Sequence, residues 1–128
     1  MLIDKDYNWQ GKKILIAEDE ETNYMLVEKF LERAHATLFR AKNGREAVEI
    51  VKSGENIDLI LMDLKMPELD GFEASKIIRA LNPELPIIAQ TCYEPDIDQS
   101  RLLCAHFDGF ISKPININRL IEIIDKHL

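Results

Sequence analysis

The sequence predicts an α/β fold, a doubly wound five-stranded parallel sheet with helices on both faces. Three observations support this class. Apolar segments of strand type alternate with segments of helical periodicity five times in succession. The run Leu59–Met62 is continuously apolar, as in a central strand buried on both faces. The chain has 128 residues, of which 46% are hydrophobic, enough for one core without disulfides.

The first half of the chain contains three predicted strands, each followed by a predicted helix. Turn chemistry marks the helix ends, because Asn43-Gly44 and Asp70-Gly71 can begin helices and Asn82-Pro83 ends one. We expect strands at Lys13–Ala17, Thr37–Ala41 and Leu59–Met62. We expect helices at Thr22–Ala34, from Asn43-Gly44 to Ser53-Gly54, and from Asp70-Gly71 to Leu81. Their predicted inward residues are Leu26, Val27, Phe30, Leu31 and Ala34; Ala47, Val48 and Val51; and Phe72, Ile77, Ile78 and Leu81.

The second half repeats the pattern twice. Pro86 leads into a predicted strand at Ile87–Gln90, and Pro95 suits the first turn of a helix that reaches about Ala105. A fifth strand is expected at Gly109–Ser112 and a last helix at Asn116–Leu128. The apolar residues of that helix recur at helical spacing, at Ile117, Leu120, Ile121, Ile124 and Leu128.

Composition narrows the functional classes. The formal net charge is −7 and there is no run of Lys or Arg, so a nucleic-acid partner is not expected. No apolar run approaches the ~20 residues of a membrane span, and the charged start is unlike a signal peptide. Cys92 and Cys104 form no metal-binding pattern, and we expect reduced thiols of a protein on the cytoplasmic side.

Polar residues follow four of the predicted strands. The first strand ends in Glu18-Asp19-Glu20, the third in Asp63, the fourth in Gln90-Thr91 and the fifth in Ser112-Lys113-Pro114. Parallel strands end at one edge of the sheet, where ligands of such folds bind. Clustered carboxylates favour a hard divalent cation, and an ammonium with a hydroxyl beside it suits a phosphoryl group. We therefore predict a cation-assisted phosphoryl site at this edge.

These residues carry a family resemblance. The chain resembles a two-component receiver domain, the phosphoacceptor module of response regulators and hybrid histidine kinases. Four stretches carry the likeness: Ile14–Glu20, the string from Leu59 through Asp63-Leu-Lys-Met-Pro-Glu-Leu-Asp-Gly71, Pro86–Thr91 and Phe110–Ile115. The resemblance implies a flavodoxin-like (βα)5 fold with strand order 2-1-3-4-5. It divides the chain into a lead-in at 1–11 and a receiver domain at 12–128.

The resemblance also implies a role for each matching residue. Asp63 is the expected phosphoacceptor, and Lys113 and Thr91 contact the phosphoryl oxygens. Thr91 and Phe110 form the expected switch, in which the aromatic ring turns inward as Thr91 moves. The expected cofactor is Mg²⁺, bound by Asp19, Asp63 and the backbone carbonyl of Lys65, with Glu18 acting through water. The Lys113–Pro114 bond is expected to be cis.

The resemblance to receiver domains also implies a functional class and a kind of partner for this protein. It implies phosphorelay signalling, with a histidine kinase phosphoacceptor domain or a histidine phosphotransfer domain as the partner and no membrane contact. The domain is expected not to be an enzyme, although it assists its own phosphorylation and dephosphorylation. The lead-in, and Ile115 after Lys113-Pro114, favour the C-terminal receiver of a hybrid sensor kinase over a free single-domain regulator. Such a receiver is cytoplasmic and can be tethered to a membrane-bound sensor.

Other readings are less well supported. A haloacid-dehalogenase-type phosphatase needs a second acid two residues after the nucleophile, where this chain has Lys65, and a P-loop hydrolase needs a motif that is missing. A degenerate receiver that binds partners without phosphorylation remains the alternative. Three positions depart from the family pattern: Cys92 follows Thr91, and His35 and His106 stand where Gly is usual in turns.

Overall fold

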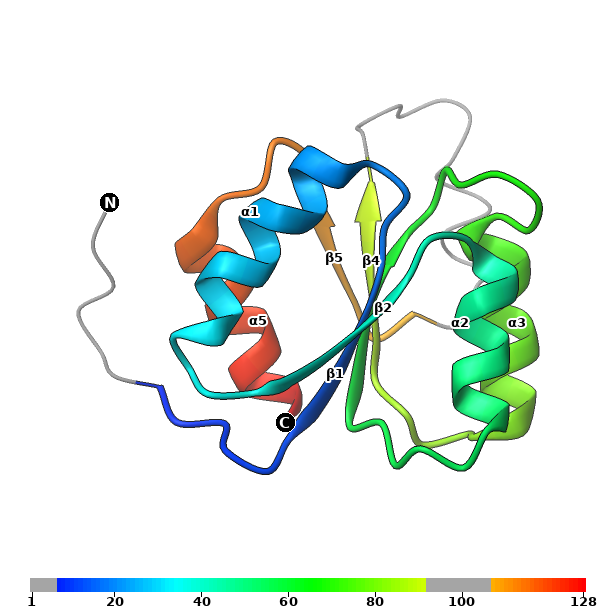
Figure 1. The fold of residues 1–128 in the computed structure, drawn as a ribbon, viewed down its shortest axis with the longest axis horizontal. Coiled ribbons are helices and arrows are strands. Elements are labelled where there is room, and N and C mark those ends of the chain that lie inside the picture. Colours follow the sequence, from blue (N-terminus) through cyan, green and yellow to red (C-terminus); the bar gives the residue numbers. More distant parts are fainter. Residues whose placement is uncertain (1–6, 92–106) are drawn as a thin grey trace.

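The computed structural model describes residues 7–91 and 107–128, which form one parallel sheet with helices on both faces (Figure 1). The strands are β1 (Lys13–Ala17), β2 (Thr37–Ala41), β3 (Leu59–Asp63), β4 (Ile87–Thr91) and β5 (Gly109–Ser112). The helices are α1 (Glu21–Glu32), α2 (Gly44–Lys52), α3 (Gly71–Leu81) and α5 (Ile117–His127). The strand order is β2-β1-β3-β4-β5, which confirms the predicted fold class and order. The helix expected from Pro95 to about Ala105 lies outside the described residues.

Two apolar layers hold the sheet between the helices. Helices α1 and α5 cover one face, and α2 and α3 cover the other (Figure 1). Every residue of β3 is buried, as the apolar run Leu59–Met62 predicted, and the burial extends to Asp63 at its end. Because side chains alternate along a strand, Ile14 and Ile16 face α1 and α5, while Leu15 and Ala17 face the other layer.

Three predicted core residues are exposed instead. Leu26 of α1 and Ile77 and Leu81 of α3 are each more than a third exposed. The sheet covers only one side of each helix, and α1 buries a narrower stripe, Tyr24, Val27 and Leu31. Periodicity alone assigned too wide an apolar face to both helices. Helix α1 also begins one residue earlier and ends two residues earlier than expected.

The lead-in contributes a large side chain to the core. Trp9 is only 4% exposed and packs in the α1/α5 layer, and its indole Nε1–H donates to Asp125 Oδ1 near the end of α5 at 2.9 Å. The Trp9 backbone N–H donates to the carbonyl of Ala34, after α1, at 2.6 Å. The sequence did not predict this role for Trp9, because a single aromatic residue in a polar segment gives no periodic pattern.

Three helices begin at the turn residues that the sequence predicted as helix starts. The side chains of Asn43, Asp70 and Asn116 each cap a helix by accepting a backbone N–H from the third residue onward. His35 has a φ of 68°, the left-handed conformation expected for a residue in a Gly-type turn. His106, and the Cys92 and Cys104 thiols, lie outside the described residues.

Candidate functional site

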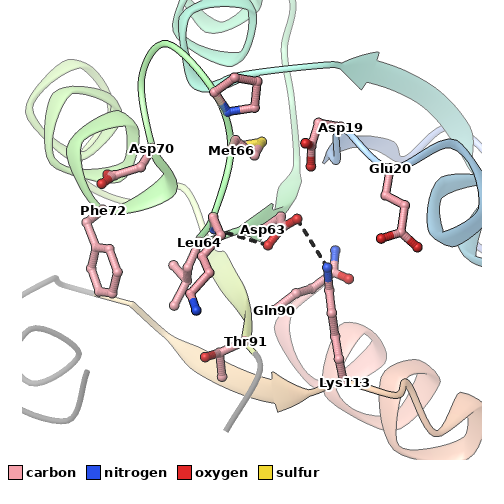
Figure 2. A pocket seen from close by; sticks show the side chains of 12 residues that line it. Asp19, Glu20, Asp63, Leu64, Met66, Asp70, Phe72, Gln90, Thr91 and Lys113 are labelled. Atoms are coloured by element: carbon pink, nitrogen blue, oxygen red, sulfur yellow. Dashed lines mark hydrogen bonds and ion pairs between the residues drawn. The ribbon is translucent and has the colours of Figure 1, made fainter. Parts of the chain in front are cut away.

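The predicted strand ends meet at one edge of the sheet. Alignment of the strands pairs Ala17 with Met62, Asp63 with Gln90, and Thr91 with Ser112. The residues that follow β1 and β5, Glu18 and Lys113, therefore arrive beside Asp63. Asp63 and Lys113, together with neighbouring loop residues, line an open cleft of about 720 Å³ (Figure 2), and Glu18 lies buried beneath it.

Strand alternation decides which side chains face one another. Four rows of side chains that face α1 and α5 end in polar residues. Along these rows Ile16 is followed by Glu18, Leu61 by Asp63, Ile88 by Gln90 and Ile111 by Lys113. Thr91 continues the row of the intervening residues, on the α3 side of the sheet. The polar site is thus the end of one apolar layer, where each row changes from isoleucine or leucine to a charged or amide side chain.

Asp63 lies on the floor of the cleft, with 5% of its surface exposed. Its Oδ2 is 3.1 Å from the Lys113 ammonium, and its Oδ1 accepts the backbone N–H of Lys65 at 3.2 Å (Figure 2). The same ammonium lies 3.2 Å from Glu18 Oε1. One cation therefore bridges two buried carboxylates.

The acidic residues form a compact cluster. Glu18, Asp19 and Asp63 each offer a carboxylate oxygen, and these three atoms lie within 4.8 Å of one another. Glu18 is fully buried, whereas Asp19 is exposed at the rim. Crowded carboxylates repel unless a cation lies between them, and all-oxygen donors are the ligands that Mg²⁺ prefers. The cluster therefore fits a hard divalent ion.

The close approach of the two carboxylates and the Lys113 ammonium shifts the pKa values of all three groups. Burial, a hydrogen bond with Glu18 and the Glu18 charge raise the pKa of Asp63 to about 7, against the opposing effect of Lys113. Burial also acts to raise the pKa of Glu18, but hydrogen bonds from Asp63 and Asn23, with the Lys113 charge, outweigh it and lower that pKa. For Lys113, burial is outweighed by both carboxylates, which raise its pKa. These opposite shifts make Asp63, rather than Glu18, the carboxyl of the pair that takes up a proton more readily.

Sequence reasoning missed the residues that hold Glu18 in place. Asn23, on the first turn of α1, donates from its Nδ2 to Glu18 Oε1 and to Gln90 Oε1, the latter at 3.3 Å. The Arg40 guanidinium donates to the Glu18 carbonyl at 3.2 and 3.4 Å and lies 4.2 Å from the centre of the Tyr24 ring. No short stretch of sequence predicts either contact, because each contact depends on how α1 and β2 lie beside the end of β1.

Thr91 and Phe110 lie on the other side of the sheet edge. Thr91 is partly exposed and lines the cleft, and Phe110 is 39% exposed on β5. Phe110 packs edge-on against Phe107, at 5.8 Å between ring centres, and Phe107 packs against Phe72 in the same manner. The Lys113–Pro114 bond is cis, as the resemblance implied.

Glycines let the loop after β3 pass close to the sheet. A Cβ on Gly71 would lie 2.2 Å from the backbone oxygen of Asp63, so only glycine fits at the start of α3. A Cβ on Gly44 would meet the Leu69 oxygen at 2.1 Å. Glu68, at the turn of this loop, has a φ of 65° and accepts a hydrogen bond from Asn43. These contacts position the loop that carries Lys65 beside Asp63.

Comparison with known proteins identifies the family. The model of the response regulator receiver domain matches residues 14–125. The chain therefore belongs to the response regulator receiver domain family, the phosphorelay modules of two-component systems, and its fold and motifs agree with that membership.

Three known proteins illustrate the family. The chain is 36% identical over 123 residues to the autoinducer 1 sensor kinase/phosphatase LuxN of Vibrio campbellii, a match that covers 94% of this chain and 14% of LuxN. The receiver domain of the sensor histidine kinase PA1611 from Pseudomonas aeruginosa, solved with magnesium in its active-site cleft, is 30% identical. It superposes with a TM-score of 0.85, covering 91% of this chain and 97% of that one.

The third is the Saccharomyces cerevisiae Ssk1 receiver domain, solved with the histidine phosphotransfer protein Ypd1. It is 31% identical with a TM-score of 0.82, covering 91% of this chain and 88% of that one. Within residues 7–91 and 107–128, no helix is long and apolar enough to span a bilayer.

Proposed function

We propose that this receiver domain accepts a phosphoryl group on Asp63 from a phosphohistidine, in a Mg²⁺-dependent reaction. One observation carries the proposal: Asp63 is a buried carboxylate at the floor of an open cleft, between the Lys113 ammonium and an acidic cluster. The surrounding protein buries most of this carboxylate, and the open cleft gives a phosphoryl group access to it. Membership of the receiver family supports the same role.

The chemistry is a direct displacement at phosphorus. A carboxylate oxygen of Asp63 forms the new O–P bond as the N–P bond of the phosphohistidine breaks, and the imidazole leaves with the electron pair and takes up a proton. Lys113, 3.1 Å from Asp63, holds an oxygen of the transferred group, and Thr91 donates its hydroxyl to another. These residues position and stabilise the group, so the domain assists its own modification without being an enzyme in the usual sense.

The acidic cluster provides the metal site. Asp19, Asp63 and the Lys65 carbonyl would hold Mg²⁺, with Glu18 contacting its water. When bound, the ion neutralises charge on both the attacking carboxylate and the phosphoryl group. Asn23 and Arg40 fix the Glu18 segment in advance, so little rearrangement accompanies binding.

Phosphorylation then changes the surface beside β4 and β5. The new group carries roughly −1.5 to −2 charges at neutral pH, which attract the Thr91 hydroxyl and the Lys113 ammonium. Movement of Thr91 vacates space on the α3 side of the sheet, and Phe110, now 39% exposed, turns inward to fill it. The altered face is the output of the domain.

The partner is a histidine phosphotransfer domain or the phosphoacceptor domain of a histidine kinase. Met25 and Leu26 of α1 are 56% and 42% exposed, and this helix begins directly after Glu20, which lines the cleft. An apolar patch beside the entrance suits a partner that must bring its histidine to Asp63. The Ssk1–Ypd1 complex supports this partner class, and LuxN supports a place in a hybrid kinase.

The test supplies Mg²⁺ and acetyl phosphate and follows intact mass. The wild-type protein and Glu49→Gln, a control with an exposed carboxylate on α2, should each gain one phosphoryl group, and Asp63→Asn should gain none. A Leu26→Ser variant should label normally with acetyl phosphate but accept phosphate more slowly from a phosphotransfer domain. If wild-type protein gains no group with either donor, the chain is instead a phosphorylation-independent binding module.

A further inference from the structure

Gln90 is a fully buried amide inside the acidic site. It is 0% exposed, sits beside Asp63 in the sheet register, and its backbone carbonyl accepts the N–H of Leu64 at 3.2 Å. Its side chain points to the face shared by Asp63 and Lys113, and Figure 2 shows it extending toward the end of the Lys113 side chain. An apolar residue would continue the Ile88 row at lower cost, so a buried amide at this position requires an explanation.

The hydrogen-bond chain settles which way this amide points. The Glu18 carboxylate accepts hydrogen bonds, so the Asn23 amide must turn its Nδ2–H₂ group toward it. The second Nδ2 hydrogen then points at Gln90, whose oxygen must face it as the acceptor, at 3.3 Å. The Gln90 Nε2–H₂ group is therefore directed away from Asn23.

The Nε2 atom has no hydrogen-bond partner among the residues that the structure describes. The other buried side-chain atom of this kind, Ser75 Oγ, lies on α3 and does not line the cleft. A buried donor without an acceptor is costly in the ligand-free protein. The cost is recovered if the acceptor arrives with the ligand.

We propose that Gln90 is a positioning residue whose buried amide N–H donates to an oxygen that enters the acidic site with the ligand. This inference rests on the proposed function, because the incoming oxygen belongs either to a water on the metal or to the phosphoryl group. Both are oxygen acceptors, and both lie within the cleft that Gln90 lines. Through Asn23, the same amide also keeps Glu18 oriented.

Nuclear magnetic resonance of the side-chain amides tests this directly. The chain has only three glutamines, Gln10, Gln90 and Gln99, and the Gln90→Met spectrum identifies the Gln90 signal. In ¹⁵N-labelled protein the Gln90 NH₂ resonances should move downfield, and their exchange with water should slow, when the ligand binds. The exposed Gln10 amide serves as the internal control.

Two arms distinguish the source of the oxygen. A shift with Mg²⁺ alone assigns the acceptor to a metal-bound water. A shift only with Mg²⁺ and beryllofluoride, whose fluorines stand where phosphoryl oxygens would, assigns it to the phosphoryl group. No shift in either arm, with ligand bound, overturns the inference and leaves the proposed function intact. Failure of the wild-type protein to bind either ligand overturns both.

Affinity and stability measured together separate positioning from a merely structural role. Gln90→Met removes the amide with little change in volume. It removes both the Nε2–H₂ donor without a partner and the acceptor for Asn23, so the two effects offset and the melting temperature of the metal-free protein should change little. The dissociation constant for the ligand should increase about three- to tenfold, the value of one hydrogen bond. A loss of stability without a loss of affinity would contradict the proposal.

Discussion

Replacing Asp63 by Asn should stabilise the metal-free protein at neutral and alkaline pH. The carboxyl is buried beside Glu18, and burial together with this neighbour raises its pKa from an ordinary 3.8 to about 7. The unfolded chain ionises the group near pH 4, whereas the folded protein keeps it protonated until about pH 7. Stability from this residue is therefore complete below pH 4 and is lost as the pH rises to 7. An amide at this position cannot ionise and avoids the loss.

The magnitude follows from the size of the shift. About three pKa units, at 1.36 kcal/mol each, set a limit of about 4 kcal/mol above pH 7. We expect Asp63→Asn to gain about 2–4 kcal/mol at pH 8, or ~10–15 °C in melting temperature for a domain of this size. Below pH 7 the advantage should shrink by about 1.4 kcal/mol per pH unit, so that at pH 5 most of it is gone.

Urea unfolding in the presence of a chelator measures the effect, at pH 5 and at pH 8. Glu49→Gln removes an exposed carboxylate from α2 and should change neither value. Adding Mg²⁺ at pH 8 should stabilise the wild-type protein by mass action and Asp63→Asn much less. If the variant is no more stable than wild type at pH 8, or if its advantage is equal at both pH values, then burial beside Glu18 does not destabilise the ionised Asp63.

Three further predictions concern residues that support the site. Trp9→Phe should lower the free energy of unfolding by about 1–2 kcal/mol in urea titrations, because it loses the hydrogen bond to Asp125; an unchanged value would mean that the lead-in does not stabilise the fold. Gly71→Ala should cost about 3 kcal/mol, since its Cβ would overlap the Asp63 oxygen, and a loss below ~1 kcal/mol would contradict the close approach. Burial and Glu28 raise the pKa of Tyr24, so tyrosinate absorbance should show its ionisation near pH 12, and ionisation near pH 10 would refute this. The stability that the neutral Tyr24 contributes should be lost as the pH rises from 10 to 12.

Regular alternation made most of the fold predictable. The bounds of β1, β2 and β5 agree with the sequence pattern, and β3 and β4 each extend by a single residue, Asp63 and Thr91. The predicted site residues converge because parallel strands end at the same edge: Asp63, Thr91 and Lys113 line one cleft, and Glu18 lies 3.2 Å from the Lys113 ammonium. Convergence of strand ends is a property of topology, and topology follows from the order of the elements.

Side-chain placement across elements was less predictable. Asn23 and Arg40 reach the Glu18 segment only because α1 and β2 flank the end of β1, which no sequence window contains. The alternation of side chains along β4 would have placed Gln90 on the same face as Asp63. That its Nε2 has no partner among the described residues depends on how the Asn23 side chain is oriented. Exposure of Leu26 and Ile77 likewise depends on how much of each helix the sheet covers.

Phosphorylation of Asp63 can be tested by locating the phosphoryl group itself. Protein treated with Mg²⁺ and acetyl phosphate is reduced with borohydride, which converts an aspartyl phosphate to homoserine, and is then mapped by peptide mass spectrometry. We expect homoserine at position 63, in the peptide that contains Leu59–Met62, and only when Mg²⁺ is present. Homoserine at another aspartate, or equal labelling with a chelator in place of Mg²⁺, would contradict it.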